Sequence, residues 1–403
     1  MKHKRATRGA ALVGLAVALG SGAGLGRAQT ITWDPAKSNL GIGAGTGITG
    51  VTGTNNQAMG TNTGNNVSTK YNLAIGDGAG TNVSGDNANQ AIGFQAGTDV
   101  KGGWNQSFGR SAGDNVTGNH NNATGFHAGS GVTGSDNNST GTNAGMTVAG
   151  SNNNAMGNGA GSNVTGSDNT GIGTNAGNNV TGSNNVSMGE GAGNNVSTNW
   201  NLAIGEGAGT NVSGKNANQA IGYYAGTDVK GGWNQTMGRS SGENVTGDYN
   251  NSTGYAAGQF VTGNRNDATG SNAGQHVTGS DNEAYGTSAG GNVTGNNNQA
   301  YGNSAGRDVN GSNNIASGAG AGAGVTGSGN QASGQMAGAQ VSGNSNIATG
   351  QGAGGGVQGN RNQAFGATAG QGVTGNDNTA QGNGAGRRVS GNANIAIGND
   401  AGI

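Results

Sequence analysis

The chain has 403 residues, of which 92 are glycine, one is proline and none is cysteine, and its formal net charge is −1. Glycine this abundant is typical of collagen or of disordered linkers, but the chain has no Gly-x-y triplet pattern and almost no proline. The near-zero net charge argues against nucleic acid as a partner, and the absence of cysteine means that no disulfide holds the fold together.

The N-terminus has the three parts of a secretory signal peptide. Basic residues cluster between Lys2 and Arg8, an apolar stretch covers residues 10–25, and Gly26-Arg27-Ala28 has the small residues of a cleavage site. We therefore expect residues 1–28 to be a signal peptide and the mature protein to be secreted or held at a bacterial cell surface, with no transmembrane segment. A membrane anchor in the same place is the alternative.

Residues 29–38 lie outside the repeat that follows and are expected to form an N-terminal cap. From residue 39 to residue 403 a unit of sixteen residues, N-x-A-x-G-x-x-A-G-x-x-V-T-G-x-x, is written about 23 times. We number its positions from the Asn, so that the central Gly is position 5, the Val is position 12, and position 16 directly precedes the next Asn. Extra residues occur only between Gly43 and Gly60, Gly76 and Gly93, and Gly205 and Gly222. A fixed period of this size indicates a solenoid.

The residue types in the repeat predict strands and turns. Asn and Gly tolerate positive φ and mark the places where the chain turns. Between them lie two short extended runs, one of the Ala-Ile-Gly type and one around the Val, and we expect a strand of about five residues in each. Stacked coils would bring the position 1 Asn side chains above one another at ~4.8 Å, so that their amides bond in a ladder. The fold class is therefore all-β, a parallel β-solenoid.

The residue before the central Gly is expected to fill the core. It is apolar in the first half of the chain and largely polar in the second, where Thr269, Ser317 and Gln381 replace it. A core this thin buries little apolar surface per coil, and we expect several chains to associate along a shared apolar face. The apolar members of this column are Ile75, Ile92, Phe108, Met156, Ile172, Met188, Ile204, Ile221 and Met237.

The A-I-G-x-x-A core of the repeat, seen at residues 74–79, 203–208 and 396–401, resembles the YadA-like (haemagglutinin-type) head repeat of the trimeric autotransporter adhesins of Gram-negative bacteria. The resemblance covers roughly residues 39–403. It implies a left-handed β-roll, a homotrimer, and a virulence role at the outer membrane in attachment to host matrix or other cells. This repeat is longer than the family's usual one. The family also continues into a stalk and a membrane anchor, whereas this chain stops within a repeat, so we expect a fragment or a protein secreted without its own anchor.

Residues 66–129 and 195–258 are near-duplicates, and they hold most of the aromatic side chains. Position 16 carries Trp104, Trp200, Trp233 and Tyr249, and position 6 carries Phe94, Phe126, Tyr223 and Tyr255. Because both positions are mostly polar in other copies, we expect these rings to face solvent. They and Tyr71 are candidate partner-binding residues for a cell-surface glycan or a matrix protein. The alternative is a structural role, in which the rings cover the inserted residues or fill a bulge.

Residue types that carry chemistry are few. His120 and His127 occupy one coil, but no carboxylate or cysteine cluster completes a metal site around them. We find no nucleophile, base or pair of acids, and therefore expect no enzyme activity and no cofactor. Two alternatives to an adhesin remain. One is a structural extracellular filament without a specific ligand, and the other is an ice-binding solenoid that orders water on Thr and Asn columns.

Overall fold

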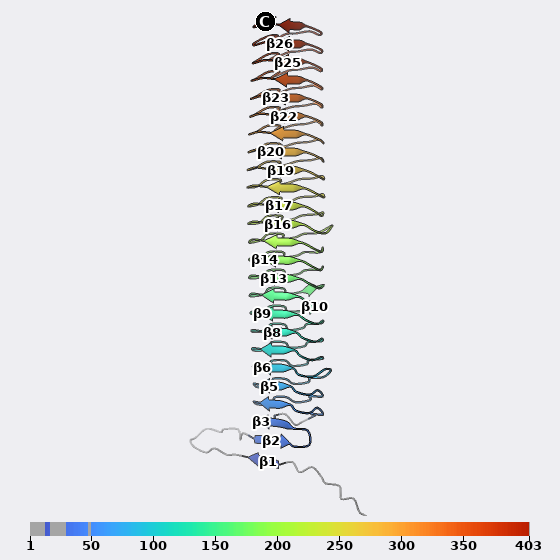
Figure 1. Ribbon diagram of the computed structural model, residues 1–403, viewed down its shortest axis with the longest axis vertical. Coiled ribbons are helices and arrows are strands. Elements are labelled where there is room, and N and C mark those ends of the chain that lie inside the picture. The colour runs from blue at the N-terminus through green and yellow to red at the C-terminus, as the bar shows by residue number, and fades with distance from the viewer. Residues whose placement is uncertain (1–12, 17–29, 47–49, 403) are drawn as a thin grey trace, which may run out of the picture. The chain divides into compact units, whose positions relative to one another are not determined.

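A computed structural model describes residues 13–16, 30–46 and 50–402, so most of the expected signal peptide lies outside the described residues. The chain forms two compact units, residues 1–191 and 192–403. In both units every strand from β3 onward that begins a coil pairs in parallel with the strands of neighbouring coils within its unit (Figure 1). Among the described residues all regular elements are strands, which confirms an all-β parallel solenoid.

In the first unit the coil-forming strands are β3 (Asn39–Ile42), β4 (Gln57–Met59), β5 (Leu73–Ile75), β6 (Gln90–Ile92), β7 (Gln106–Phe108), β8 (Asn122–Thr124), β9 (Asn138–Thr140), β11 (Asn154–Met156), β13 (Thr170–Ile172) and β14 (Val186–Met188). Two further short strands, β10 (Val148–Ala149) and β12 (Val164–Thr165), pair in parallel on the valine side. The N-terminal strands are β1 (Val13–Ala16) and β2 (Thr30–Asp34).

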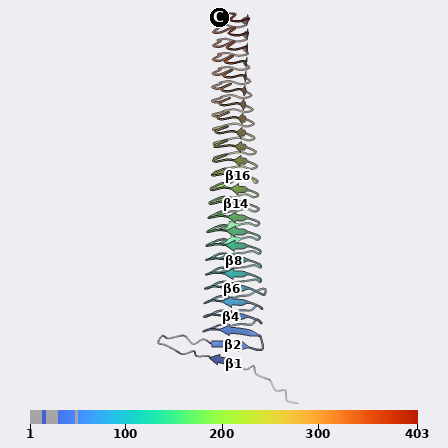
Figure 2. The same cartoon turned by 60° about the vertical axis from the view of Figure 1, so that its left-hand side comes forward.

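In the second unit one short strand per coil repeats along the chain, and Figure 2 shows these stacked strands from another side. Its strands are β15 (Leu202–Ile204), β16 (Gln219–Ile221), β17 (Gln235–Met237), β18 (Asn251–Thr253), β19 (Asp267–Thr269), β20 (Glu283–Tyr285), β21 (Gln299–Tyr301), β22 (Ile315–Ser317), β23 (Gln331–Ser333), β24 (Ile347–Thr349), β25 (Gln363–Phe365), β26 (Thr379–Gln381) and β27 (Ile395–Ile397).

The strands are shorter than the five residues expected, because so much of each coil has positive φ. Most strands cover only positions 2 to 4, and on the valine side most coils pair through a single bridge at position 13, such as Thr262↔Thr278. In the coil that begins at Asn298, six of sixteen residues lie in the positive-φ region: Gly302, Ser304, Gly306, Asp308, Gly311 and Asn313. Extended backbone cannot continue through such residues, so each strand ends after about three residues.

The N-terminal strands occupy the edge of the first coil. Strand β2 pairs antiparallel with β3, with Trp33 opposite Leu40, and β1 pairs antiparallel with β2. An open strand edge invites pairing with another chain, and β2 fills that edge of β3. This is the place where residues 29–38 were expected to form a cap.

The core is built from small residues, and the expectation for position 4 was wrong. Ala at position 3, Ala at position 8 and Val at position 12 are almost fully buried, as Ala300, Ala305 and Val309 illustrate. The residue before the central Gly points outward instead, and Met156 and Met237 are more than half exposed. Side chains of a strand alternate between its two faces. Because the Asn at position 1 points inward, position 3 is the next inward place and positions 2 and 4 face away from the core.

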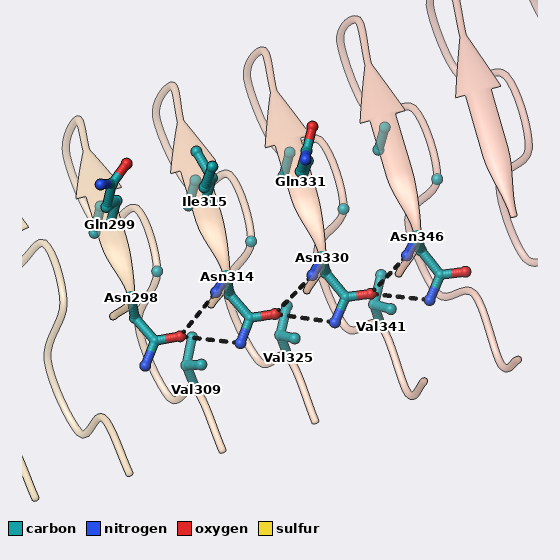
Figure 3. Close-up of a pocket in the computed structure, with 18 of the residues that line it drawn as sticks. Asn298, Gln299, Val309, Asn314, Ile315, Val325, Asn330, Gln331, Val341 and Asn346 are labelled. Carbon is teal, nitrogen blue, oxygen red and sulfur yellow. Dashed lines mark hydrogen bonds between the residues drawn. The ribbon is translucent and has the colours of Figure 1, made fainter. Parts of the chain in front are cut away.

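The buried Asn column forms the expected ladder (Figure 3). The Asn314 side-chain oxygen accepts a hydrogen bond from the backbone N–H of Asn330 at 3.0 Å and from its side-chain amide at 3.0 Å. The Asn314 amide donates in turn to the Asn298 side-chain oxygen and to the carbonyl of Gly327. The first unit repeats the pattern, for example at Asn137. Each amide therefore stays satisfied although it is buried.

A second ladder at position 15 was not expected from the sequence. The side-chain oxygen of a position 15 residue accepts a hydrogen bond from the backbone N–H of position 15 in the preceding coil. Ser135 donates to Ser151 in this way at 3.0 Å, and Asn360 donates to Asn376 at 2.9 Å. Position 15 is Ser, Asn or Asp in most copies, and this restriction was the available signal. The ladder satisfies backbone groups that the turn leaves without a strand partner.

Candidate aromatic and apolar binding surface

The outward residues of the coil-forming strands, at positions 2 and 4, include exposed and half-buried apolar side chains in each unit, which we call the apolar stripe. Met156 and Met237 stand in it with 56% and 54% of their surface exposed. Contiguous exposed apolar surface on a soluble protein marks an interaction site. In the first unit the stripe comprises Met59, Leu73, Ile75, Ile92, Phe108, Met156, Ile172, Val186 and Met188. In the second unit it comprises Leu202, Ile204, Ile221, Met237, Tyr285, Tyr301, Ile315, Ile347, Phe365, Ile395 and Ile397.

Two tyrosines of the second stripe form a small polar contact within it. Tyr285 and Tyr301 stack with ring centroids 5.4 Å apart and nearly parallel planes. The Tyr301 hydroxyl donates a hydrogen bond to the Glu283 carboxylate, which together with partial burial raises the pKa of Tyr301 to about 12. Burial also raises the pKa of Tyr285. Both hydroxyls are therefore neutral at physiological pH.

The position 16 aromatics form one exposed column in each unit, which we call the position 16 column. Trp104, Trp200, Trp233 and Tyr249 are each between 43% and 59% exposed. Tyr71, which was expected to bind a partner but was assigned to no column, also precedes a repeat Asn and belongs to the same column. Neighbouring rings stack along the column: Trp104 on His120 at 5.4 Å, and Trp233 on Tyr249 at 5.2 Å.

The backbone of the position 16 column does not favour aromatic residues. Trp104, Trp233 and Tyr249 have φ between 56° and 60°. This left-handed region suits Gly, Asn and Asp, and a residue with a bulky side chain pays about 1–2 kcal/mol to adopt it. The rings therefore occupy these positions despite the local backbone preference. An unfavourable residue at such a position points to a role for the side chain itself.

The position 6 aromatics are held by arginines between them. The Arg110 guanidinium lies 5.6 Å from the Phe94 ring centroid and 5.5 Å from that of Phe126. In the second unit Arg239 lies 5.3 Å from the Tyr223 ring and 5.8 Å from the Tyr255 ring. All four rings are exposed. One face of each ring is already occupied by a cation, which favours the structural interpretation for this column.

Further exposed rings were not anticipated from the sequence. Phe260 and His276 stack at 4.8 Å at position 11, with φ of 57° and 54°. Position 11 is usually Asn or Asp, so an aromatic residue there was the signal. In the first unit His127 packs edge-on against Phe126 at 4.1 Å, and in the second Tyr224 packs edge-on against Tyr223 at 4.5 Å.

A charged pair flanks the second position 16 column. Lys215, which lies in the coil with an inserted residue, reaches Asp248 two coils on at 2.5 Å. It passes Gly232, where an added Cβ would lie 2.6 Å from the Cβ of Lys215. The hydrogen bond from Lys215 lowers the pKa of Asp248, and the same bond raises the pKa of Lys215. Residues 86 and 119 take the corresponding places in the first unit, as Asp86 and Asn119.

Within the described part of the chain, no group of three or more His, Cys, Asp or Glu side chains is placed to hold a metal ion. The same residues contain no helix with the length and apolar character needed to cross a bilayer. No protein-family model, no curated protein and no solved structure matches this chain.

Proposed function

We propose that the chain is an exported cell-surface adhesin whose β-solenoid head assembles as a homotrimer along the apolar stripe and attaches the cell to host matrix or to other cells. The observation that carries this proposal is the stripe itself. Its Ile, Met and Phe side chains point away from the core, which is built from Ala, Val and other small or polar side chains. The resemblance of the A-I-G-x-x-A core to trimeric adhesin heads supports the same assembly.

Self-association is the simplest way to remove the stripe from water. Ile204, Ile221 and Met237 come from successive coils that pair in register, so their side chains form a straight row. An identical straight row on another copy presents the same spacing, and apolar rows of this kind are typical of the buried centre of oligomer interfaces. Three copies around one axis give a closed assembly in which each copy makes the same contacts.

The aromatic columns would remain accessible in such a trimer. Position 16 lies two residues before position 2, and position 6 lies two residues after position 4, so both columns border the proposed interface rather than fill it. Exposed rings on a polar surface are suited to contact with sugars or with protein side chains. Attachment is therefore assigned to the position 16 column, whose rings no arginine among the described residues covers, and assembly to the stripe.

The oligomeric proposal is tested by a triple variant of the stripe, Ile204→Thr, Ile221→Thr and Met237→Thr. Threonine already occupies the same column at Thr253 and Thr269, so the coils should stay intact. We expect wild type to have the mass of three chains by light scattering and the variant to dissociate. The matched control is Met336→Asn, which changes an exposed Met outside the stripe at a positive-φ position that Asn tolerates. A variant that remains trimeric would contradict the assignment of the stripe.

Attachment is tested by coating wells with the wild-type protein and counting the epithelial cells that stay bound after washing. A second set of wells carries laminin or collagen and receives the protein in solution. We expect the coated wells to retain cells, or the laminin or collagen wells to retain the protein, or both. A folded trimer that retains no cells and no matrix protein would contradict the adhesin proposal and leave a structural filament.

An ice-binding function is the second candidate, because one observation favours it. Thr246, Thr262, Thr278 and Thr294 lie at position 13 of successive coils, are exposed and are linked by parallel bridges. The row is regular over this stretch. Lys230 stands at its start, and Asn310 follows it. Thermal hysteresis of the purified protein decides this candidate, and freezing without hysteresis removes it.

A further inference from the structure

The position 16 column has the same four-residue order in both units. In the first unit it reads Tyr71, Ala88, Trp104 and His120, and in the second it reads Trp200, Ala217, Trp233 and Tyr249. Each set has one small residue between two aromatic residues. All eight residues have φ between 56° and 64°, so their Cα–Cβ bonds project from the coils in the same way. The hydrogen bonds of this turn continue through the inserted residue, with the Ala88 N–H bound to the Lys70 carbonyl at 2.8 Å.

The small side chain of alanine should leave a gap, whose width follows from the spacing of the coils. Where both neighbours are aromatic, the rings stack at 5.2–5.4 Å. The two aromatic residues on either side of the alanine are two coils apart, which is about 9.6 Å at the usual strand spacing. Rings stack with centroids about 4.5 Å or more apart, so one ring fits between the two walls with about 4.8 Å to each. Ala88 and Ala217 are half-buried at the base of these gaps. We call the gaps the first and second aromatic slots.

Alanine is an unexpected residue at this place. Other members of the column are often Asn, as at Asn152 and Asn184, and Asn tolerates the left-handed region better than Ala does. At Ala88 and Ala217 the chain therefore forgoes a favourable backbone residue. What the alanine provides is the open space between the two rings, since an Asn side chain would occupy it.

Polar groups surround each slot. In the first, the exposed Asp86 lies two residues before Ala88, in the coil that carries the inserted residue. In the second, Lys215 lies two residues before Ala217 and is paired with Asp248. Aromatic walls with charged groups at the rim form the environment that a sugar ring needs, because its C–H faces are apolar and its edge carries hydroxyl groups.

We infer that the two aromatic slots are carbohydrate-binding sites, each of which takes one pyranose ring between its aromatic walls. The inference deepens the proposed attachment function and rests on it, since it names a glycan as the molecule to which the surface attaches. The first slot lies between Tyr71 and Trp104, and the second between Trp200 and Trp233. The rim residues Asp86 and Lys215 with Asp248 bind the ring's hydroxyl groups.

The test fills the slots without disturbing the backbone. The double variant Ala88→Asn and Ala217→Asn introduces the residue that the left-handed region prefers, so its thermal unfolding should occur at or above the wild-type temperature. The matched control is Ala393→Asn, which makes the same change at position 16 with φ of 57° but follows Asp377 in the column rather than an aromatic residue. The probes are cellotetraose, chitotetraose and mannotetraose, printed on an array and then titrated by calorimetry.

We expect wild type and the Ala393→Asn control to bind the same tetrasaccharide with equal affinity. The filled variant should bind it about tenfold or more weakly, because the ring loses contact with two aromatic faces. Equal binding by the filled variant would overturn the slots, and so would a wild-type protein that binds none of the three probes. Binding of deglycosylated laminin that the filled variant loses would show a protein side chain in the slot, and would also overturn the sugar assignment.

The failure of this inference is distinguishable from that of the proposed function. If the filled variant retains cells on coated wells as well as wild type does, attachment stands and the slots do not carry it. If tetrasaccharide binding depends on the slots while wild type retains no cells, the slots stand and the adhesin proposal fails.

Discussion

Removal of one buried amide from the Asn ladder should destabilise the second unit far more than removal of an exposed one. In Asn314→Ala the backbone N–H of Asn330 loses its acceptor, and the carbonyl of Gly327 loses the amide that donates to it. The side chains of Asn298 and Asn330 each keep another partner, at the backbone N–H of residue 314 and at the Gly343 carbonyl. A buried donor without a partner costs about 1–3 kcal/mol, and with the lost carbonyl bond we expect about 2–4 kcal/mol in all.

Hydrogen exchange measured by mass spectrometry detects this change locally, which matters because repeat arrays do not always unfold in one step. A loss of 2 kcal/mol corresponds to roughly 30-fold faster exchange in peptides that cover residues 314–346. The control is Asn303→Ala in the preceding coil, whose exposed side chain accepts a hydrogen bond only from Ser304 among the described residues. It should change stability by less than about 0.5 kcal/mol. Equal exchange in the two variants would refute the role of the ladder.

Two other changes follow from particular contacts. Gly286→Ala places a Cβ 2.6 Å from the Gly302 carbonyl oxygen, at φ of 133°, and should lower the melting temperature sharply. Gly324→Asn should leave the melting temperature nearly unchanged, because at φ of 71° the atom nearest to an added Cβ is 3.7 Å away. The pKa of Tyr301 is raised to about 12 by its bond to Glu283, so that the stabilising contribution of this contact is present below pH 10 and is lost as the pH rises through about 12. Tyrosinate absorbance should show a late titration step that Tyr301→Phe removes, and a late step that persists in that variant would assign it elsewhere.

The repeat register allowed much of the fold to be predicted from the sequence. A period of sixteen with Asn and Gly at fixed positions predicted a parallel solenoid with an Asn ladder, and the structure confirms both. The burial of that Asn was not predicted, because Asn was interpreted as a turn residue. The face of position 4 could not be read in the same way. In a strand a shift of one residue exchanges inside and outside, and only the inward direction of the position 1 Asn decides that Met156 and Met237 face solvent. The apolar character of the position 4 residues was the sole reason to expect them in the core.

The candidate site was predictable in part for a similar reason. Exposure of Trp104 and Trp233 followed from the polar residues that share their column, and the structure bears out that exposure. Arg110 lies between the rings of Phe94 and Phe126, so the position 6 rings are covered whereas the position 16 rings are open. These contacts join neighbouring coils and could not be predicted from the sequence. The aromatic slots likewise emerge only when Ala88 is placed between its neighbours in adjacent coils, because in the sequence those neighbours are sixteen or seventeen residues away.

The mass of the full chain in solution, measured by light scattering after size exclusion, tests the central proposal most directly. We predict a stable trimer, in which the outward Ile, Met and Phe side chains of the apolar stripe are buried between copies. A folded monomer that stays soluble at high concentration would contradict the proposed assembly, because the stripe would then remain exposed to water without a partner.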